Sequence, residues 1–238
     1  MKNLKVFFII ATAIATIFVL SKFFNFGFLR NFQENADKRI EGIRDKIEDL
    51  EKEKIKDVRT LARLADQYTQ LGTIYLEKRL WDSAVQNYDK GIKYGKNTPG
   101  VFYSIGLAHA NRGSERESRD DIDKAEFYYH KAIEMQSNYY DAQNALAILL
   151  FYHKNEKEKA LSIIEGVVSR NKSSYIARFT LGRFYYEMNN LDKALSVYED
   201  LESDLAKLPP SGIINEFKSQ CRENIQRIMS ELSMRKSK

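Results

Sequence analysis

The stretch that decides the fold runs from Tyr68 to Ile92 and reads YTQLGTIYLEKRLWDSAVQNYDKGI. It contains no histidine or cysteine, no glycine-rich phosphate loop and no serine beside a base. Its ordered features are Leu71-Gly72-x-x-Tyr75 and, further on, Ala84-x-x-x-Tyr88. A small residue flanked by large ones three and four positions away is typical of a helix that another helix approaches closely. The stretch therefore predicts two packed helices and no reactive site.

The same pattern recurs three times along the chain. The small residues of the first helices are Gly72, Gly106, Ala147 and Gly182, which are 34, 41 and 35 residues apart. The second helices carry Trp81-x-x-Ala84-x-x-x-Tyr88-x-x-Gly91, Ile122-x-x-Ala125-x-x-x-Tyr129-x-x-Ala132, Ala160-x-x-x-Ile164-x-x-Val167 and Leu191-x-x-Ala194-x-x-x-Tyr198-x-x-Leu201. A helical hairpin cannot bury its apolar face alone, so such units stack on one another.

This pattern resembles the tetratricopeptide repeat (TPR) family, whose period is about 34 residues. Repeats one and four match the family motifs most fully, whereas repeat three has Ala147 and Ile164 at the motif positions. The resemblance implies an all-α solenoid of about four helical hairpins. We expect an array over residues 64–208, with repeats near 65–98, 99–138, 139–173 and 174–208.

The C-terminal segment, residues 209–238, predicts a capping helix and a short tail. Ser211 follows Pro209-Pro210 and can cap a new helix. One apolar stripe follows, formed by Ile214, Phe217, Cys221, Ile225, Ile228 and Leu232. A repeat array needs a terminal cap with a polar outer face, and this segment fits that need.

The 41-residue step places seven extra residues in segment 111–124, NRGSERESRDDIDK, between the two helices of repeat two. Nine of its fourteen residues are charged, which predicts a position outside the core. We expect an elongated helix turn or an exposed loop. A partner-binding loop is the alternative.

Residues 1–30 predict an N-terminal membrane anchor. Val6 to Ser21 carries no charge, and with Lys22 snorkelling the stretch from Leu4 to Leu29 could span a hydrocarbon core of about 30 Å. A cleaved signal peptide is the alternative, but no small-x-small site follows the apolar run. The very short N-terminal tail favours a single-pass membrane protein with its TPR domain on the extracytoplasmic (periplasmic) side, although basic residues flank both ends.

Residues 31–63 predict a charged helical stalk. Within it an apolar seam has alternating spacings of four and three and consists of Ala36, Ile40, Ile43, Ile47 and Leu50. The seam lasts about two heptads, fewer than the three to four of a sustained coiled coil. Two interpretations stay open. One is a solvated helix whose later half packs on the next helix, and the other is a short dimerising coiled coil.

The residue types argue against chemistry. The lone cysteine, Cys221, excludes a Cys-based zinc site, and the three histidines lack metal-ligand spacing. We therefore predict no enzyme, no cofactor, no metal and no small-molecule substrate. A net charge of +5 without a Lys/Arg block predicts a solvated surface and no nucleic acid.

The resemblance also implies where a partner would bind. First helices of TPR repeats line a concave groove, and their groove-facing positions flank the small residue. The implied partner-binding residues are Thr69, Thr73, Tyr103, Asn144, Tyr152, Phe179, Arg183 and Tyr186. Thr69 and Thr73 stand where some TPR domains carry the Lys and Asn of a carboxylate clamp, which disfavours a chaperone-tail ligand.

The expected function is a membrane-anchored TPR scaffold or adaptor that binds a protein or peptide partner in the groove. The architecture is similar to bacterial inner-membrane TPR proteins that accompany translocation or envelope-assembly machinery. The alternative is a self-assembling structural membrane protein that forms a homodimer through residues 36–50.

Overall fold

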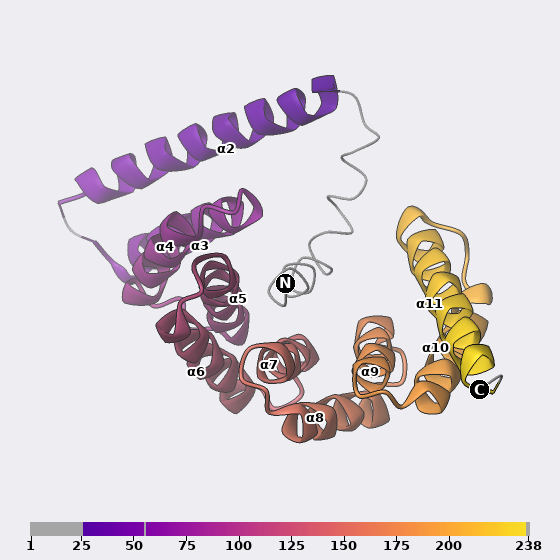
Figure 1. Ribbon diagram of the computed structural model, residues 1–238. Coiled ribbons are helices and arrows are strands. Elements are labelled where there is room, and N and C mark those ends of the chain that lie inside the picture. Colours follow the sequence, from indigo (N-terminus) through magenta and orange to yellow (C-terminus); the bar gives the residue numbers. More distant parts are fainter. Residues whose placement is uncertain (1–25, 55, 237–238) are drawn as a thin grey trace. The chain divides into compact units, whose positions relative to one another are not determined.

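The computed structural model describes residues 26–54 and 56–236, and every regular element in this part of the chain is an α-helix (Figure 1). In order these are α2 (Phe26–Lys52), α3 (Val58–Glu77), α4 (Trp81–Lys93), α5 (Pro99–Arg116), α6 (Arg119–Met135), α7 (Tyr140–Tyr152), α8 (Lys157–Arg170), α9 (Tyr175–Glu187), α10 (Leu191–Ala206) and α11 (Gly212–Lys236). Short turns join the successive helices, as a chain of helical hairpins requires.

The chain divides into two compact units between Ala145 and Leu146, inside α7. The first unit contains α2 to α6 and the beginning of α7. The second contains the end of α7 and α8 to α11. Within the first unit α3 packs on α4 and α5 packs on α6, and within the second α9 packs on α10, which in turn packs on α11.

Each glycine of the first-helix motif lies directly under a tyrosine ring of the second helix. A methyl group on Gly106 would come within 2.6 Å of the Tyr129 ring, too close for any real side chain. The corresponding approach is 2.9 Å between Gly72 and Tyr88 and 2.9 Å between Gly182 and Tyr198. In repeat three Ala147 and Ile164 occupy these positions, and both are fully buried. The small residues are therefore the points of closest helix approach.

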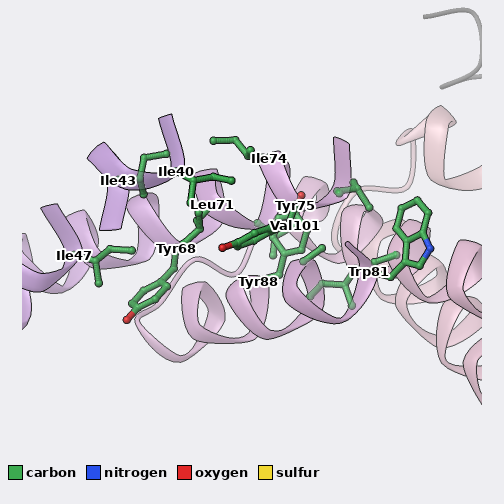
Figure 2. Packing of buried hydrophobic residues seen from close by; sticks show 14 of the residues in the cluster. Ile40, Ile43, Ile47, Tyr68, Leu71, Ile74, Tyr75, Trp81, Tyr88 and Val101 are labelled. Atoms are coloured by element: carbon green, nitrogen blue, oxygen red, sulfur yellow. The ribbon is translucent and has the colours of Figure 1, made fainter. Parts of the chain in front are cut away.

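The apolar seam of α2 packs against α3 of the same chain. Figure 2 shows Ile40, Ile43 and Ile47 facing Tyr68 and Leu71 across this contact. All five seam residues are at most 8% exposed. Since this packing occupies the seam within one chain, the dimer predicted through residues 36–50 would need the same face that α3 already covers.

Polar contacts fix the register of α2 on α3. Arg44 donates to the Tyr75 hydroxyl over 2.7 Å, and the Tyr68 hydroxyl donates to Glu51 over 2.6 Å. Lys78 pairs with Asp37 at the other end of the contact, over 2.5 Å. Thus α2 contacts α3 along most of its described length and extends the core of repeat one.

Two substitutions at neighbouring positions of α2 test this contact. Ile43→Val should lower the free energy of unfolding of the first unit by about 1 kcal/mol, because it removes a buried methylene. Gly42→Ala should raise it by about 0.5–1 kcal/mol, because open space surrounds Gly42 and alanine favours the helix. Hydrogen exchange of α2 and α3 measures both. No loss of protection in Ile43→Val would contradict the packing.

The structure corrects the predicted fold class and localisation. Within residues 26–54 and 56–236, no helix is both long enough and apolar enough to cross a membrane. The N-terminal helix of this part, α2, has the length, but charged side chains crowd it from Arg30 onward. The prediction of a transmembrane helix in the fold and the prediction of a single-pass membrane localisation are therefore wrong. Residues 1–25 of the predicted anchor lie outside the described residues.

The C-terminal helix α11 packs on α10 through Cys221 and Ile228, which are both fully buried. Arg222 of α11 donates to Glu202 of α10 over 2.6 Å. Burial raises the pKa of the Cys221 thiol to about 12, so the thiol stays protonated and serves as a small core residue.

Candidate partner-binding site

Local signals set where the first helices begin. Thr98 caps α5 by accepting from the Val101 amide, and Pro99 occupies the first helical position. Ser174 caps α9 in the same way through the Ala177 amide. These caps fix the residues at which α5 and α9 begin.

In repeat one, the predicted residues Thr69 and Thr73 bond to their own helix. Thr69 donates to the Ala65 carbonyl over 2.8 Å and lies against Gly91 of α4. The exposed Thr73 donates to the Thr69 carbonyl over 3.1 Å. Its hydroxyl also lies 3.1 Å from that of Tyr88. Of the two side chains, that of Thr73 is the more exposed to solvent.

In repeat two, Tyr103 is half-buried in an aromatic cluster of the first unit. Its ring lies 5.6 Å from that of Tyr139 in an edge-on arrangement and 6.1 Å from that of Tyr129. Burial and the nearby Asp141 raise the pKa of Tyr103. Much of this side chain is thus used to hold α5 against α6 and against Tyr139, which directly precedes α7.

Asn144 of α7 carries a buried side-chain oxygen that has no hydrogen-bond partner within the described part of the chain. Such an unpaired acceptor costs about 1–3 kcal/mol relative to a paired one. The only comparable side-chain atoms in the described residues are the amide oxygen of Gln67 on α3 and the hydroxyl of Tyr152 on α7. Asn144 and Tyr152 are both residues that the repeat register assigns to the partner-facing side.

In the second unit, Tyr152 and Arg183 are brought together. The Arg183 guanidinium carbon lies 5.4 Å from the centre of the Tyr152 ring. The ring also packs edge-on against Phe151 and Phe184. Burial raises the pKa of Tyr152 to about 12, and the charge of Arg183 opposes that rise.

The other two predicted residues of repeat four contact α11. Phe179 packs edge-on against Tyr198 and Phe217, with ring centres 5.3 and 6.2 Å apart. The Tyr186 hydroxyl donates to Glu231 over 2.5 Å, and Arg227 lies 4.7 Å above the Tyr186 ring. The sequence pattern missed Arg227, because it lies outside the repeats on a helix whose placement no local motif fixes.

Segment 111–124 forms an extension of both helices of repeat two. The turn between them contains Glu117, whose φ of 54° lies in the left-handed region, and Ser118, which caps α6 through the Asp121 amide. Although the segment is highly charged, Asp121 is only 6% exposed. The expectation that this segment lies outside the core therefore fails at Asp121.

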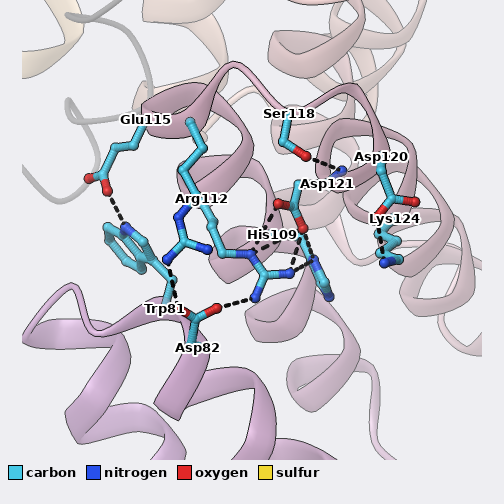
Figure 3. A network of polar contacts seen from close by, with 10 residues as sticks. Trp81, Asp82, His109, Arg112, Glu115, Ser118, Asp120, Asp121 and Lys124 are labelled. Atoms are coloured by element: carbon cyan, nitrogen blue, oxygen red, sulfur yellow. Dashed lines mark hydrogen bonds and ion pairs between the residues drawn. The ribbon is translucent and has the colours of Figure 1, made fainter.

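A polar network surrounds Asp121, as Figure 3 shows. Arg112 contacts both oxygens of Asp121 at 2.5–3.1 Å and reaches Asp82 of α4 over 2.6 Å. Arg116 reaches the other oxygen of Asp82 over 2.6 Å. Because Asp82 belongs to repeat one, the network ties repeat one to repeat two.

His109 belongs to the same network. Its Nδ1 lies 2.8 Å from Asp121, and its ring stacks on Tyr128 at 5.6 Å. Hydrogen bonds from Arg112 and His109 hold the pKa of Asp121 well below its usual range against the effect of burial. The same Nδ1 also lies 3.0 Å from the Arg112 guanidinium, so a proton on Nδ1 serves the Asp121 carboxylate, which can only accept, and a lone pair on Nδ1 serves Arg112, which can only donate. Burial and the Arg112 charge lower the pKa of His109, which keeps the ring neutral at pH 7.

The network therefore has the composition of a structural clamp, in which two arginines and a histidine contact two aspartates. In the described residues, no group of three or more histidine, cysteine or acidic side chains is placed to hold a metal ion. The side chains with unmet hydrogen-bonding capacity lie instead on α3 and α7.

Known proteins resemble this chain over part or most of its length. Residues 118–201 match a family model described as anaphase-promoting complex, cyclosome, subunit 3. Photosystem I assembly protein Ycf3 of Prochlorococcus marinus (strain MIT 9215) is 30% identical over 88 residues. That match covers 37% of this chain and 47% of Ycf3, so the chain spans about half the length of this curated relative.

Solved structures match more of the chain. MamA superposes with a TM-score of 0.56 at 19% identity, covering 78% of this chain and 99% of MamA. A thermophilic TPR protein from Thermus thermophilus, TTC0263, gives a TM-score of 0.58 at 14% identity, covering 84% of this chain and 95% of that one. At these identities the likeness concerns the fold.

The described part of the chain consists of successive helix pairs without strands, and in three of the pairs a glycine lies under a tyrosine ring. This arrangement defines an α-helical repeat protein. The motif spacing and the matched structures identify the repeat more closely. The chain has the fold of tetratricopeptide repeat proteins such as TTC0263.

Proposed function

We propose that this protein is a scaffold or adaptor that binds a protein or peptide partner on the first helices of its repeats. The proposal assigns no reaction to the chain. The observation that carries it is the pair of buried, unpartnered oxygens, Asn144 in the first unit and Tyr152 in the second. Peptide groups and polar side chains of a partner would supply the missing hydrogen bonds.

Two further features support the proposal. Aromatic side chains are frequent at the predicted partner-facing positions of the later repeats, and the parts of them that neighbouring helices leave exposed would give contact area at low entropic cost. The chain also matches part of Ycf3, which is a photosystem I assembly protein, and a role in holding proteins together is in keeping with that likeness.

The proposal predicts that Tyr152→Phe separates stability from binding. Removing an unpartnered buried hydroxyl should leave the free energy of unfolding unchanged or raise it by up to about 1 kcal/mol. The same change should reduce the amount of partner recovered by in-cell crosslinking of the tagged full chain. Asn144→Leu should behave in the same way in the first unit.

Tyr185→Phe is the matched control. The Tyr185 hydroxyl donates to Glu165 over 2.5 Å within the second unit. We expect this variant to lose about 1 kcal/mol of stability while it recovers the same partner in the same amount. Full partner recovery by both Tyr152→Phe and Asn144→Leu would refute the proposed role of these helices.

A further inference from the structure

Two arginines of the second unit lack an acidic partner. Neither Arg183 of α9 nor Arg227 of α11 has a carboxylate oxygen within ion-pair distance in the described part of the chain, and each guanidinium lies over a tyrosine ring instead. Their neighbours differ, since Arg178 pairs with Asp204 over 2.7 Å and Arg222 pairs with Glu202 over 2.6 Å. An unpaired guanidinium keeps most of its five donors available.

The charges of the two guanidinium groups affect the same tyrosine hydroxyl. Burial raises the pKa of the Tyr198 hydroxyl, and the charges of both Arg183 and Arg227 oppose the rise. The geometry agrees, because Arg183 lies one helical turn before Tyr186 on α9 and Arg227 of α11 lies 4.7 Å over the Tyr186 ring. Tyr152, under Arg183, adds a buried hydroxyl without a hydrogen-bond partner in the described residues. Two cations and a phenol donor thus surround one small region formed by α7, α9 and α11.

Planar guanidinium groups bind carboxylates through two parallel hydrogen bonds, and stacking on an aromatic ring holds the plane in place. Acidic side chains at the edge of the region limit how much negative charge it accepts. Glu187 contributes to the raised pKa of both Tyr152 and Tyr186, and Glu231 accepts from the Tyr186 hydroxyl. A singly charged carboxylate therefore suits the region better than a doubly charged phosphate.

We propose that Arg183, Arg227 and the Tyr152 hydroxyl form a binding site for a side-chain carboxylate of an acidic peptide segment. This inference rests on the proposed scaffold function and adds the chemistry of the partner. The aromatic rings of Tyr152 and Tyr186 form the walls, and the two guanidinium groups supply the charge. None of these three residues lies in the first two repeats, where the clamp of chaperone-tail receptors would be found.

The test uses the full chain and a fluorescein-labelled hexaglutamate peptide with blocked ends. Fluorescence anisotropy at low salt should show binding that weakens as salt rises, and hexaglutamine should bind at least about tenfold more weakly. Arg183→Gln and Arg227→Gln should each weaken hexaglutamate binding about tenfold. Tyr152→Phe should weaken it severalfold, and Glu187→Gln should strengthen it because a repelling charge is removed.

Arg222→Gln is the matched control, since Arg222 lies on the same helix as Arg227 and is already paired. It should leave the affinity unchanged. An equal loss in Arg222→Gln would show unspecific attraction, and inorganic phosphate competing better than glutamate would assign the site to phosphate. Either result overturns the inference. If hexaglutamate does not bind while Tyr152→Phe still reduces partner recovery, the inference fails and the scaffold function stands.

Discussion

Replacing Asp121 with asparagine should lower the free energy of unfolding of the first unit by about 3 kcal/mol, because it removes the anion that a buried arginine requires. The side chains of Asp121 and Arg112 are only 9% and 14% exposed. In the variant, Arg112 would keep Asp82, which is about half exposed and so compensates little. Denaturant unfolding followed by hydrogen exchange in α5 and α6 measures the change.

Asp120→Asn is the control for this prediction. Asp120 precedes Asp121, is largely exposed and pairs with Lys124 on the surface. Its loss should change the free energy of unfolding by less than about 0.5 kcal/mol. Equal effects of the two substitutions would show that the network around Arg112 does not stabilise the fold.

The same network sets a pH dependence. The folded-state pKa of Asp121 is lowered, so its contribution is fully present above the ordinary aspartate pKa of about 3.9 and is lost as the pH falls through the lower folded value. The stability difference between the native chain and Asp121→Asn should therefore shrink in acid. A difference that stays constant between about pH 7 and pH 2 would contradict the ionised carboxylate.

Gly106→Ala is expected to destabilise the first unit by about 2 kcal/mol, because the new methyl group would overlap the Tyr129 ring. The distance of 2.6 Å leaves no room, and the ring is buried and cannot move aside. This loss exceeds the gain of up to about 1 kcal/mol that alanine usually brings to a helix. Thermal or denaturant unfolding of the full chain gives the sign of the change in the free energy of unfolding.

Repeat three supplies the compensating change. There Ala147 and Ile164 take the places of the glycine and the tyrosine. Tyr129→Ile in the Gly106→Ala background should thus cost at least about 1 kcal/mol less than the sum of the single changes. Gly100→Ala, on the same helix but with only an ordinary 3.6 Å contact to Tyr139, should not destabilise the chain. Strict additivity of the two core changes would refute the contact.

The repeat itself could be predicted from the sequence, because the glycine and the tyrosine that touch recur at fixed spacing. The seam of α2 could be predicted as a buried face, but a spacing of four and three does not say which helix covers it. The burial of Asp121 was missed because a charged run looks the same whether solvated or clamped. The motif Ser118-x-x-Asp121 was the available signal, since it marks the start of a helix.

Part of the candidate site could likewise be predicted from the sequence, and part could not. The register assigned Tyr152 and Arg183 to the partner-facing side, and the structure places the guanidinium over the ring. Phe179 and Tyr186 were assigned to the same side, yet α11 lies against both. Which first-helix residues a terminal helix covers depends on long-range packing, which no single repeat encodes.

We expect partners to contact the first helices of the repeats. Photo-crosslinking of the full chain tests it most directly, with benzoylphenylalanine placed at Thr73 or Tyr103 on first helices and at Gln86 or Glu199 on exposed faces of second helices. Adducts with the same partner should form from Thr73 and Tyr103 and be absent from Gln86 and Glu199. Adducts of equal yield from the second-helix positions would contradict the account.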